Sequence, residues 1–165
     1  MKIETPMGMA WASVENGVVT RFGFGDDPHE SAADPDVARQ VDEYFGGARA
    51  AFDLPLAPRG SAFQKRVWSE LMRIPFGETI SYAELARRVG RPGASRAVGR
   101  ANATNPIALI IPCHRVIGST GALTGYAFGV DLKRKLIEWE RTVADERRSD
   151  IALSGESGLS RAAAR

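Results

Sequence analysis

Residues 81–103 of the 165-residue chain read SYAELARRVGRPGASRAVGRANA, and this stretch sets the architecture of the second half. It opens with the S-x-x-E pattern of a capping box, which predicts a short helix from Tyr82 to Val89 that Gly90 closes. After the Pro-Gly turn, a further helix is predicted from about Ala94 to Ala103. Two short helices joined by a glycine-bearing turn indicate a helix-turn-helix.

The second of these helices has small side chains on one face. Arg96, Arg100 and Asn102 extend from it and would reach phosphates or base edges if the helix approached DNA. The small residues, Ala97 among them, permit such an approach, but they also occur where two helices pack tightly. Both interpretations stay open on the helix alone.

Charge is unevenly distributed along the chain. The sequence holds 22 Lys and Arg against 20 Asp and Glu, a formal net charge of +2. Residues 1–56 carry 4 basic and 10 acidic side chains, whereas residues 57–142 carry 14 basic and 6 acidic ones. The basic segment either forms an ordinary solvated face or meets phosphates. The small overall charge therefore does not exclude a polyanionic partner.

The first part of the chain has a strand pattern. Met9 to Val14 and Val18 to Phe24 are rich in β-forming residues and flank Glu15-Asn-Gly17. The Asn-Gly pair favours the positive φ angles of a tight hairpin turn, so a β-hairpin is predicted. Phe52 to Leu56 suggests one more strand.

One helix is predicted between these strand segments. Asp34 and Pro35 have the residue types of an N-cap and a first helical position, and Gly46-Gly47 ends the pattern. Val37, Val41 and the pair Tyr44/Phe45 fall on its apolar face.

The remaining pattern is helical. Ser61 to Gln64 forms another capping box, and Trp68 is expected in the core with the apolar repeat Phe63, Val67, Leu71 and Ile74. Four segments are therefore expected: a strand-rich N-terminal domain over 1–56, a linker over 57–60, a C-terminal helix-turn-helix and active-site domain over 61–148, and a flexible tail over 149–165.

The chain has one cysteine, Cys113, inside the sequence Pro112-Cys-His-Arg-Val116. By default a lone cysteine is a small buried hydrophobe and a neighbouring histidine is structural. Here the pair follows the apolar, strand-like run Ile107 to Ile111, where the chain must bend and both side chains can face inward. An imidazole held by a carboxylate would then supply the base that converts the thiol to a nucleophilic thiolate.

Cysteine usage and hydropathy exclude several classes of protein. One cysteine permits no intrachain disulfide, and metal binding is not expected because Cys113, His114 and His29 are too few ligands. The longest apolar block, Ile107 to Ile111, is far shorter than the roughly 20 residues that a membrane helix needs, and no secretion signal is apparent. We expect a cytoplasmic location.

Several short motifs accompany the cysteine. They are Phe63-Gln64, Val67-Trp68, Ile74-Pro75, Gly77-Glu-Thr79, Ser81-Tyr82, Arg96-Ala-Val-Gly99, Asn105-Pro106, Gly121 and Gly125-Tyr126. With Pro112-Cys-His-Arg-Val116, these motifs make residues 60 to 140 closely resemble the O6-alkylguanine-DNA alkyltransferase family.

The resemblance implies an α/β fold, with a small strand-rich, RNase H-like N-terminal domain and a mostly helical C-terminal domain that carries a helix-turn-helix DNA-binding motif. It implies a monomeric DNA repair protein with no cofactor, no membrane attachment and no obligate protein partner. Its partner would be double-stranded DNA containing alkylated guanine. The alkyl group, mainly methyl, would pass irreversibly to Cys113 in one turnover, and O4-alkylthymine stays open as a second substrate.

The resemblance also implies roles for individual residues. Cys113 corresponds to the acceptor thiol, His114 to a base that acts through a water molecule, and Glu140 to the carboxylate that orients the histidine. Asn105 corresponds to the brace of the active-site turn, and Tyr82 to the tyrosine beside the flipped nucleotide.

Two further groups of residues follow from the resemblance. Arg96 corresponds to the finger that fills the vacated space in the base stack, on the same helix as Ala97, Arg100 and Asn102. The substrate pocket would be formed by the backbone of Cys113, Val116 and Ala127, with Tyr126 as a wall, Phe128 at the rim and Lys133 nearby.

The sequence departs from the family pattern at two places. Ala103-Thr104 follows Asn102 where Asn-Gly is usual, which puts the end of the DNA-binding helix in question. Phe128 stands where glycine is common, so we expect methyl groups to be accepted readily and benzyl-sized groups poorly, unless the ring packs away from the pocket.

Three other classes of protein share part of this pattern. A cysteine hydrolase would need an oxyanion site that nothing here suggests, and a transcription factor would leave Pro112 to Val116 without a purpose. The alternative that remains is a non-catalytic, alkyl-lesion-binding helix-turn-helix protein, although its members replace the acceptor cysteine that is present here as Cys113.

Overall fold

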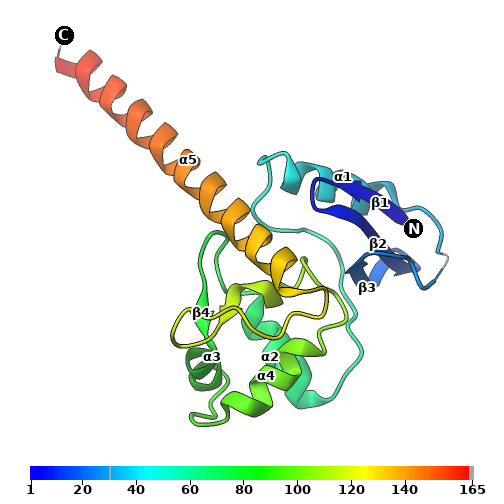
Figure 1. Ribbon diagram of the computed structural model, residues 1–165. Helices are drawn as coiled ribbons and strands as arrows, with labels where there is room; N and C mark the ends of the chain where they lie inside the picture. Colours follow the sequence, from blue (N-terminus) through cyan, green and yellow to red (C-terminus); the bar gives the residue numbers. More distant parts are fainter. Residues whose placement is uncertain (30, 164–165) are drawn as a thin grey trace.

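The computed structural model describes residues 1–29 and 31–163, and Figure 1 shows a small antiparallel sheet beside a helical half. The N-terminal elements are the strands β1 (Lys2–Thr5), β2 (Gly8–Glu15) and β3 (Val18–Phe24) and the helix α1 (Pro35–Phe45). The other elements are the helices α2 (Ala62–Leu71), α3 (Tyr82–Arg88), α4 (Ser95–Ala103) and α5 (Val130–Ala163), the 3-10 helix η1 (Cys113–Arg115), and the short strands β4 (Ile80–Ser81) and β5 (Val116–Ile117). The predicted α/β class is confirmed.

The sheet is built on the predicted hairpin. β2 and β3 pair antiparallel, and their turn places Asn16 at a φ of 52° and Gly17 at 79°. Two consecutive positive φ angles match the right-handed twist of the strands, which explains why Asn-Gly occupies this turn. β1 pairs with β2 and completes a three-stranded sheet in the order β1-β2-β3.

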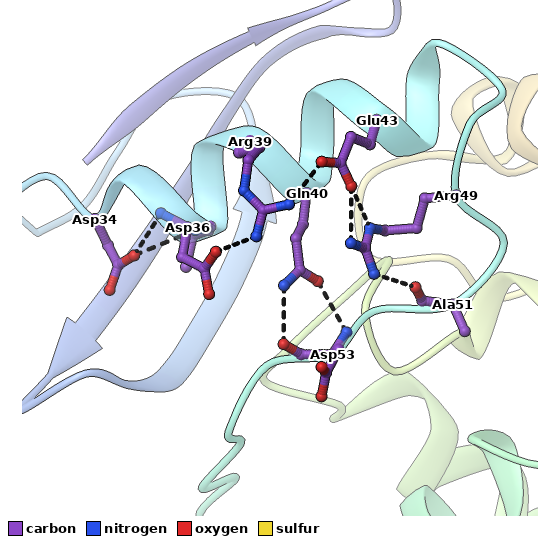
Figure 2. A network of polar contacts seen from close by, with 9 residues as sticks. Asp34, Asp36, Arg39, Gln40, Glu43, Arg49, Ala51 and Asp53 are labelled. Atoms are coloured by element: carbon purple, nitrogen blue, oxygen red, sulfur yellow. Dashed lines mark hydrogen bonds and ion pairs between the residues drawn. The ribbon is translucent and has the colours of Figure 1, made fainter.

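Helix α1 begins as its sequence predicts. The Asp34 side chain accepts hydrogen bonds from the backbone N–H groups of Asp36 and Val37, and Pro35 takes the first helical position. Figure 2 shows this cap and, one turn later, Gln40, whose side-chain amide exchanges two 2.8 Å hydrogen bonds with the backbone of Asp53. The segment that follows α1 is therefore hydrogen-bonded back to the helix at Gln40.

The outer edge of β3 joins the two halves of the chain. Val19 forms a parallel bridge with Leu56, and Phe22 forms one with Ile107. The strand suggested over Phe52 to Leu56 is thus reduced to one bridge. Because the N–H of Ala57 donates to the Val19 carbonyl (2.9 Å), the first residue of the expected linker is bonded to the sheet. Pairing with two separate segments covers an edge that would otherwise expose free backbone groups.

Helices α2, α3 and α4 pack together as the predicted helix-turn-helix and its support. Ser61 and Gln64 form the reciprocal capping box of α2, and Ser81 caps α3. Trp68 is fully buried, and its indole N–H donates to the carbonyl of Ala101 in α4 (2.8 Å). This contact ties the helix-turn-helix to the core.

The apolar run Ile107 to Ile111 is not the strand-like segment that the sequence suggests. All five residues are buried, but the backbone folds in local turns, with the Ile111 N–H donating to the Ile107 carbonyl (3.0 Å) and Leu109 at a φ of 66°. Hydropathy indicated the burial correctly but not the backbone conformation, since an apolar run is compatible with both.

The prediction of a flexible tail is corrected by helix α5. The sequence predicts a helix that gives way to a flexible extension after residue 148, whereas α5 continues to Ala163 and projects beyond the rest of the chain (Figure 1). No proline interrupts residues 149–163, so a helix anchored at its start can continue. Within residues 1–29 and 31–163, no helix has an apolar stretch long enough to cross a membrane.

Candidate active site

Cys113 opens the single turn of η1, directly after Pro112. Its side chain is buried, with 6% of its surface exposed. Burial raises the pKa of the Cys113 thiol, because a thiolate loses its hydration in the interior. A side-chain hydrogen bond with Asn105 and the charge of Lys133 oppose this rise in part. The free thiol is therefore neutral until a base removes its proton.

His114 is next to the thiol in sequence and fully buried. Its Nε2 lies 2.7 Å from Glu140 Oε1. An ionised carboxylate only accepts hydrogen bonds, so Nε2 carries the ring proton and Nδ1 of the neutral ring has a free lone pair. Nδ1 has no hydrogen-bond partner among the described residues. The pairing thus leaves one basic nitrogen of His114 without a partner in the described residues.

Glu140, on α5, is the buried anion of the site. Its carboxylate accepts from Arg115 through both oxygens, each at 2.8 Å, and from the Tyr44 hydroxyl at Oε1 (2.8 Å). Burial raises the pKa of Glu140, but the neighbouring His114 and the hydrogen bonds from His114 and Arg115 outweigh it and hold this pKa far below its usual range. Glu140 is therefore ionised, as orienting His114 requires.

Two asparagines brace the turn that presents Cys113. The Asn105 side chain donates to the Ile111 carbonyl (2.8 Å) and accepts from the Ile107 N–H (3.0 Å), as the predicted brace would. Asn102 donates to the carbonyl of Cys113 (3.2 Å) and is 2% exposed. The expectation that Asn102 reaches phosphates or base edges is corrected, because its side chain faces the interior.

The other residues of α4 that are predicted to contact DNA remain at least partly accessible. Arg96 and Arg100 are exposed, and Ala97 is half-buried. Gly99 lies against Tyr82, since a Cβ at this position would be 3.8 Å from the tyrosine ring. The two exposed arginines therefore belong to the helix that packs on Tyr82 through Gly99.

Tyr82 and Lys133 meet at one carbonyl. The Tyr82 hydroxyl and the Lys133 ammonium both donate to the Thr124 carbonyl, at 3.2 and 2.9 Å, and Nζ lies 5.8 Å from the centre of the Tyr82 ring. Lys133 is fully buried, and burial lowers its pKa. These contacts hold the segment before Tyr126 over the site.

The remaining pocket candidates lie on both sides of this segment. Val116 is fully buried in β5, Ala127 is exposed, and the Tyr126 hydroxyl is buried without a hydrogen-bond partner in the described part of the chain. The Phe128 ring packs edge-on against Phe24 of β3 and against Tyr126, each at 5.7 Å between ring centres. Packing on β3 supports the alternative in which Phe128 points away from the pocket.

Two residues that bind Glu140, Arg115 and Tyr44, have no predicted role in the sequence. Arg115 belongs to the quoted Pro-Cys-His-Arg motif, and a charged residue directly after a buried run signals a buried partner. Tyr44 was placed on the apolar face of its helix, and a buried tyrosine hydroxyl needs a partner too. Neither signal names Glu140 as that partner, because the contacts span 25 and 96 residues.

The arrangement can deliver a nucleophile. A neutral thiol, a neighbouring imidazole with one free nitrogen, and a buried carboxylate on the opposite nitrogen form the Cys-His-acid pattern of activated thiols. Among the residues that the structure describes, no group of three or more His, Cys, Asp and Glu side chains is placed to hold a metal ion.

Comparisons with known proteins point to one family. The family model described as "6-O-methylguanine DNA methyltransferase, DNA binding domain" matches residues 62–142. The methylated-DNA–protein-cysteine methyltransferase of Mycolicibacterium paratuberculosis is 43% identical over 148 residues, which cover 84% of this chain and 90% of the relative. The protein of the same name from Methanosarcina acetivorans is 55% identical over 105 residues, covering 64% of this chain and 67% of that protein.

A solved structure agrees with these relatives. The crystal structure of Mycobacterium tuberculosis OGT in complex with DNA matches with a TM-score of 0.80 and 43% identity, over 86% of this chain and 92% of that one. The similarity therefore extends over both the sheet and the helical half.

Proposed function

The chain belongs to the 6-O-methylguanine DNA methyltransferase family, and on this premise we propose that Cys113 is the residue on which it repairs DNA. Its activity is the direct transfer of an alkyl group from O6-alkylguanine in double-stranded DNA to a cysteine of the protein. Since the chain contains one cysteine, that acceptor is Cys113.

The observation that carries this assignment is the hydrogen-bonded series that ends beside the thiol. Glu140 fixes the proton of His114 on Nε2, which leaves Nδ1 free to act as a base in the residue that follows Cys113. A merely structural histidine in the interior would be expected to satisfy both ring nitrogens. The free nitrogen supports a role in removing the thiol proton.

The transfer forms one bond and breaks one. The Cys113 thiol gives its proton to His114 Nδ1, through a water molecule as the family resemblance implies, and the sulfur attacks the alkyl carbon. The S–C bond forms as the O6–C bond breaks, and its electron pair leaves with the guanine, which takes up a proton. The imidazolium that forms on His114 lies against ionised Glu140 and is stabilised by it.

The helix-turn-helix brings the lesion to the thiol. Inside a duplex the alkyl carbon cannot be reached in line, so the base must leave the stack at a cost of a few kcal/mol. Arg96 fills the vacated space, and Arg100 and other exposed arginines of the helix-turn-helix contact phosphates, which offsets this cost. Tyr82, at the junction of α4 and the pocket, lies beside the flipped nucleotide.

Each molecule reacts once. A thioether is a poor leaving group, and the chain has no second thiol that could restore Cys113. The protein acts as a monomeric cytoplasmic reagent that one lesion consumes.

A titration tests this function against non-catalytic lesion binding. Duplex DNA carrying O6-methylguanine is mixed with increasing amounts of protein, and the bases are separated after hydrolysis. We expect guanine to replace O6-methylguanine in proportion to the protein added, with a plateau at one lesion per molecule. Tight binding that leaves the lesion intact would instead identify a non-catalytic lesion-binding protein.

A further inference from the structure

The carboxylate that orients the active-site histidine is held partly from the other half of the chain. Tyr44, near the end of α1, donates its hydroxyl to Glu140 Oε1 at 2.8 Å across 96 residues of sequence. Both side chains are fully buried or nearly so. The contact is therefore a specific long-range hydrogen bond inside the core.

Aromatic packing fixes the direction of this hydroxyl. The Tyr44 ring meets Phe45 edge-on at 4.9 Å, stacks on Phe52 at 5.4 Å and meets Phe76 edge-on at 5.7 Å. Burial and the nearby Glu140 raise the pKa of Tyr44 well above its usual value, so the hydroxyl keeps its proton and stays a donor. A ring enclosed on several sides cannot turn away without disturbing its neighbours.

The two oxygens of Glu140 accept different numbers of close hydrogen bonds. Oε1 accepts from Tyr44, from His114 Nε2 and from Arg115 Nη2, all within 2.8 Å. Oε2 accepts from Arg115 Nε at 2.8 Å and from the Gly77 N–H only at 3.5 Å. The Arg115 fork binds both oxygens at 2.8 Å and so does not distinguish them. The Tyr44 hydroxyl does distinguish them, because it binds the oxygen that His114 uses and so resists a movement of that oxygen away from Nε2.

From this geometry we propose that Tyr44 is a positioning residue for alkyl transfer: its hydroxyl keeps Glu140 Oε1 where it orients His114. The inference rests on the proposed function, since it acts through the His114 base. It assigns the N-terminal half a part in positioning the catalytic base, beyond supporting the helical half. Tyr44 does not touch the reacting atoms and acts only through Glu140.

The test compares Tyr44→Phe with a matched control on the same helix. Tyr44→Phe removes the hydroxyl and keeps the ring. Gln40→Met, one helical turn earlier, removes two buried hydrogen bonds to Asp53 and touches neither Glu140 nor His114 (Figure 2). Thermal unfolding is recorded for each variant, so that a loss of stability is measured separately from an effect on transfer.

Two measurements separate positioning from packing. The first is the single-turnover rate of methyl transfer at saturating lesion-bearing duplex, together with the DNA concentration that gives half of that rate. The second is the proton resonance of His114 Nε2–H in protein labelled with 15N-histidine, in which His29 is the only other histidine. A purely structural residue would leave this resonance in place.

We expect Tyr44→Phe to lower the limiting rate about three- to tenfold, as the loss of one buried hydrogen bond would, with an unchanged half-saturating DNA concentration. The His114 resonance moves upfield as its bond to Oε1 lengthens, and Gln40→Met alters neither quantity. An unchanged rate and resonance in Tyr44→Phe, or equal slowing by Gln40→Met, would overturn the inference. Wild-type protein that transfers no methyl group would instead refute the proposed function, while the resonance still reports on the Tyr44 contact.

Discussion

The thiol of Cys113 is protected from ionisation in the free protein. Burial raises its pKa above the ordinary value near 9.0, and the Lys133 charge and the Asn105 contact only moderate that rise. A group whose folded-state pKa is raised keeps its proton as the pH climbs past the unfolded value. Reactivity toward the lesion must therefore come from the His114 base at the moment of transfer.

This account predicts the ultraviolet titration of the free protein. We expect the thiolate absorbance near 240 nm, taken as the difference from Cys113→Ser, to appear only above pH 9. The pKa of the thiol is raised because desolvation disfavours the charged thiolate. A midpoint well below that pH would mean that the thiol is already activated without DNA.

Phe128 departs from the family pattern, and its contacts suggest a different role from the one that its position in the sequence predicts. Its position suggested a narrowed pocket, whereas its ring packs on Phe24 and so close to β3 that a Cβ on Gly23 would lie 2.9 Å from it. Its role is then to join the pocket segment to the sheet.

We therefore predict that Phe128→Ala destabilises the protein by about 1–3 kcal/mol, less than a fully buried phenylalanine would, because the ring is half-buried. The ratio of transfer rates for O6-methylguanine and O6-benzylguanine should change little. Chemical denaturation and competition kinetics measure the two quantities. A large gain in benzyl transfer with little loss of stability would instead show that Phe128 narrows the pocket rim.

Helix α4 divides its polar residues between two tasks. Arg96 and Arg100 face outward, whereas Asn102 faces the Cys113 turn. If α4 contacts DNA through these arginines as we propose, the same helix also holds the Cys113 carbonyl through Asn102, which links lesion binding to the position of the thiol.

Arg96→Ala is expected to slow transfer from duplex about tenfold or more, with much less change for the free base O6-methylguanine, since only the duplex loses a stacked base. The matched control for the lost charge is Arg134→Ala. Arg134 is an exposed arginine of α5 that pairs with Asp131. Single-turnover kinetics on both substrates measure the effect. Equal slowing of duplex and free base would exclude a finger role for Arg96.

Local signals predicted the elements that depend on neighbouring residues. The Asn16-Gly17 turn, the Asp34 cap and the Ser61 capping box each act within four residues, and all three form as predicted. The roles of Cys113, His114 and Glu140 follow from the family resemblance, and the 2.7 Å contact between His114 and Glu140 supports the roles proposed for that pair.

The features that the sequence missed depend on distant partners. Tyr44 reaches Glu140 across the interior, and Asn102 turns inward because the Cys113 carbonyl lies beneath it. A hydropathy pattern reports that a residue is buried, but it does not name the neighbour. The continuation of α5 was also missed, because composition alone could not separate a helix from a flexible tail.

The two halves differ in charge and share one active site. The acidic segment 1–56 supplies Tyr44, and the basic segment 57–142 supplies the thiol, the base and the helix-turn-helix. We propose the division into 1–56, the linker 57–60 and 61–148 on this basis, with the β3 edge as the junction.

The projecting part of α5 is expected to be dispensable for repair. Truncation after Ser149 keeps Lys133, Leu136 and Glu140, the buried residues by which α5 meets the core and the site. We predict a transfer rate within twofold of the full chain and a stability change below about 1 kcal/mol. A larger loss in either would place residues 150–163 in contact with DNA or with the core.

The acceptor assignment is tested most directly by weighing one peptide. The protein is incubated with duplex carrying O6-methylguanine and digested with trypsin, and the peptide from Ala101 to Arg115 is measured beside that of Cys113→Ser. The account predicts a mass gain of one methylene on Cys113, absent from the variant, with guanine restored in the DNA. An unmodified peptide from a reaction in which the lesion has disappeared would contradict it.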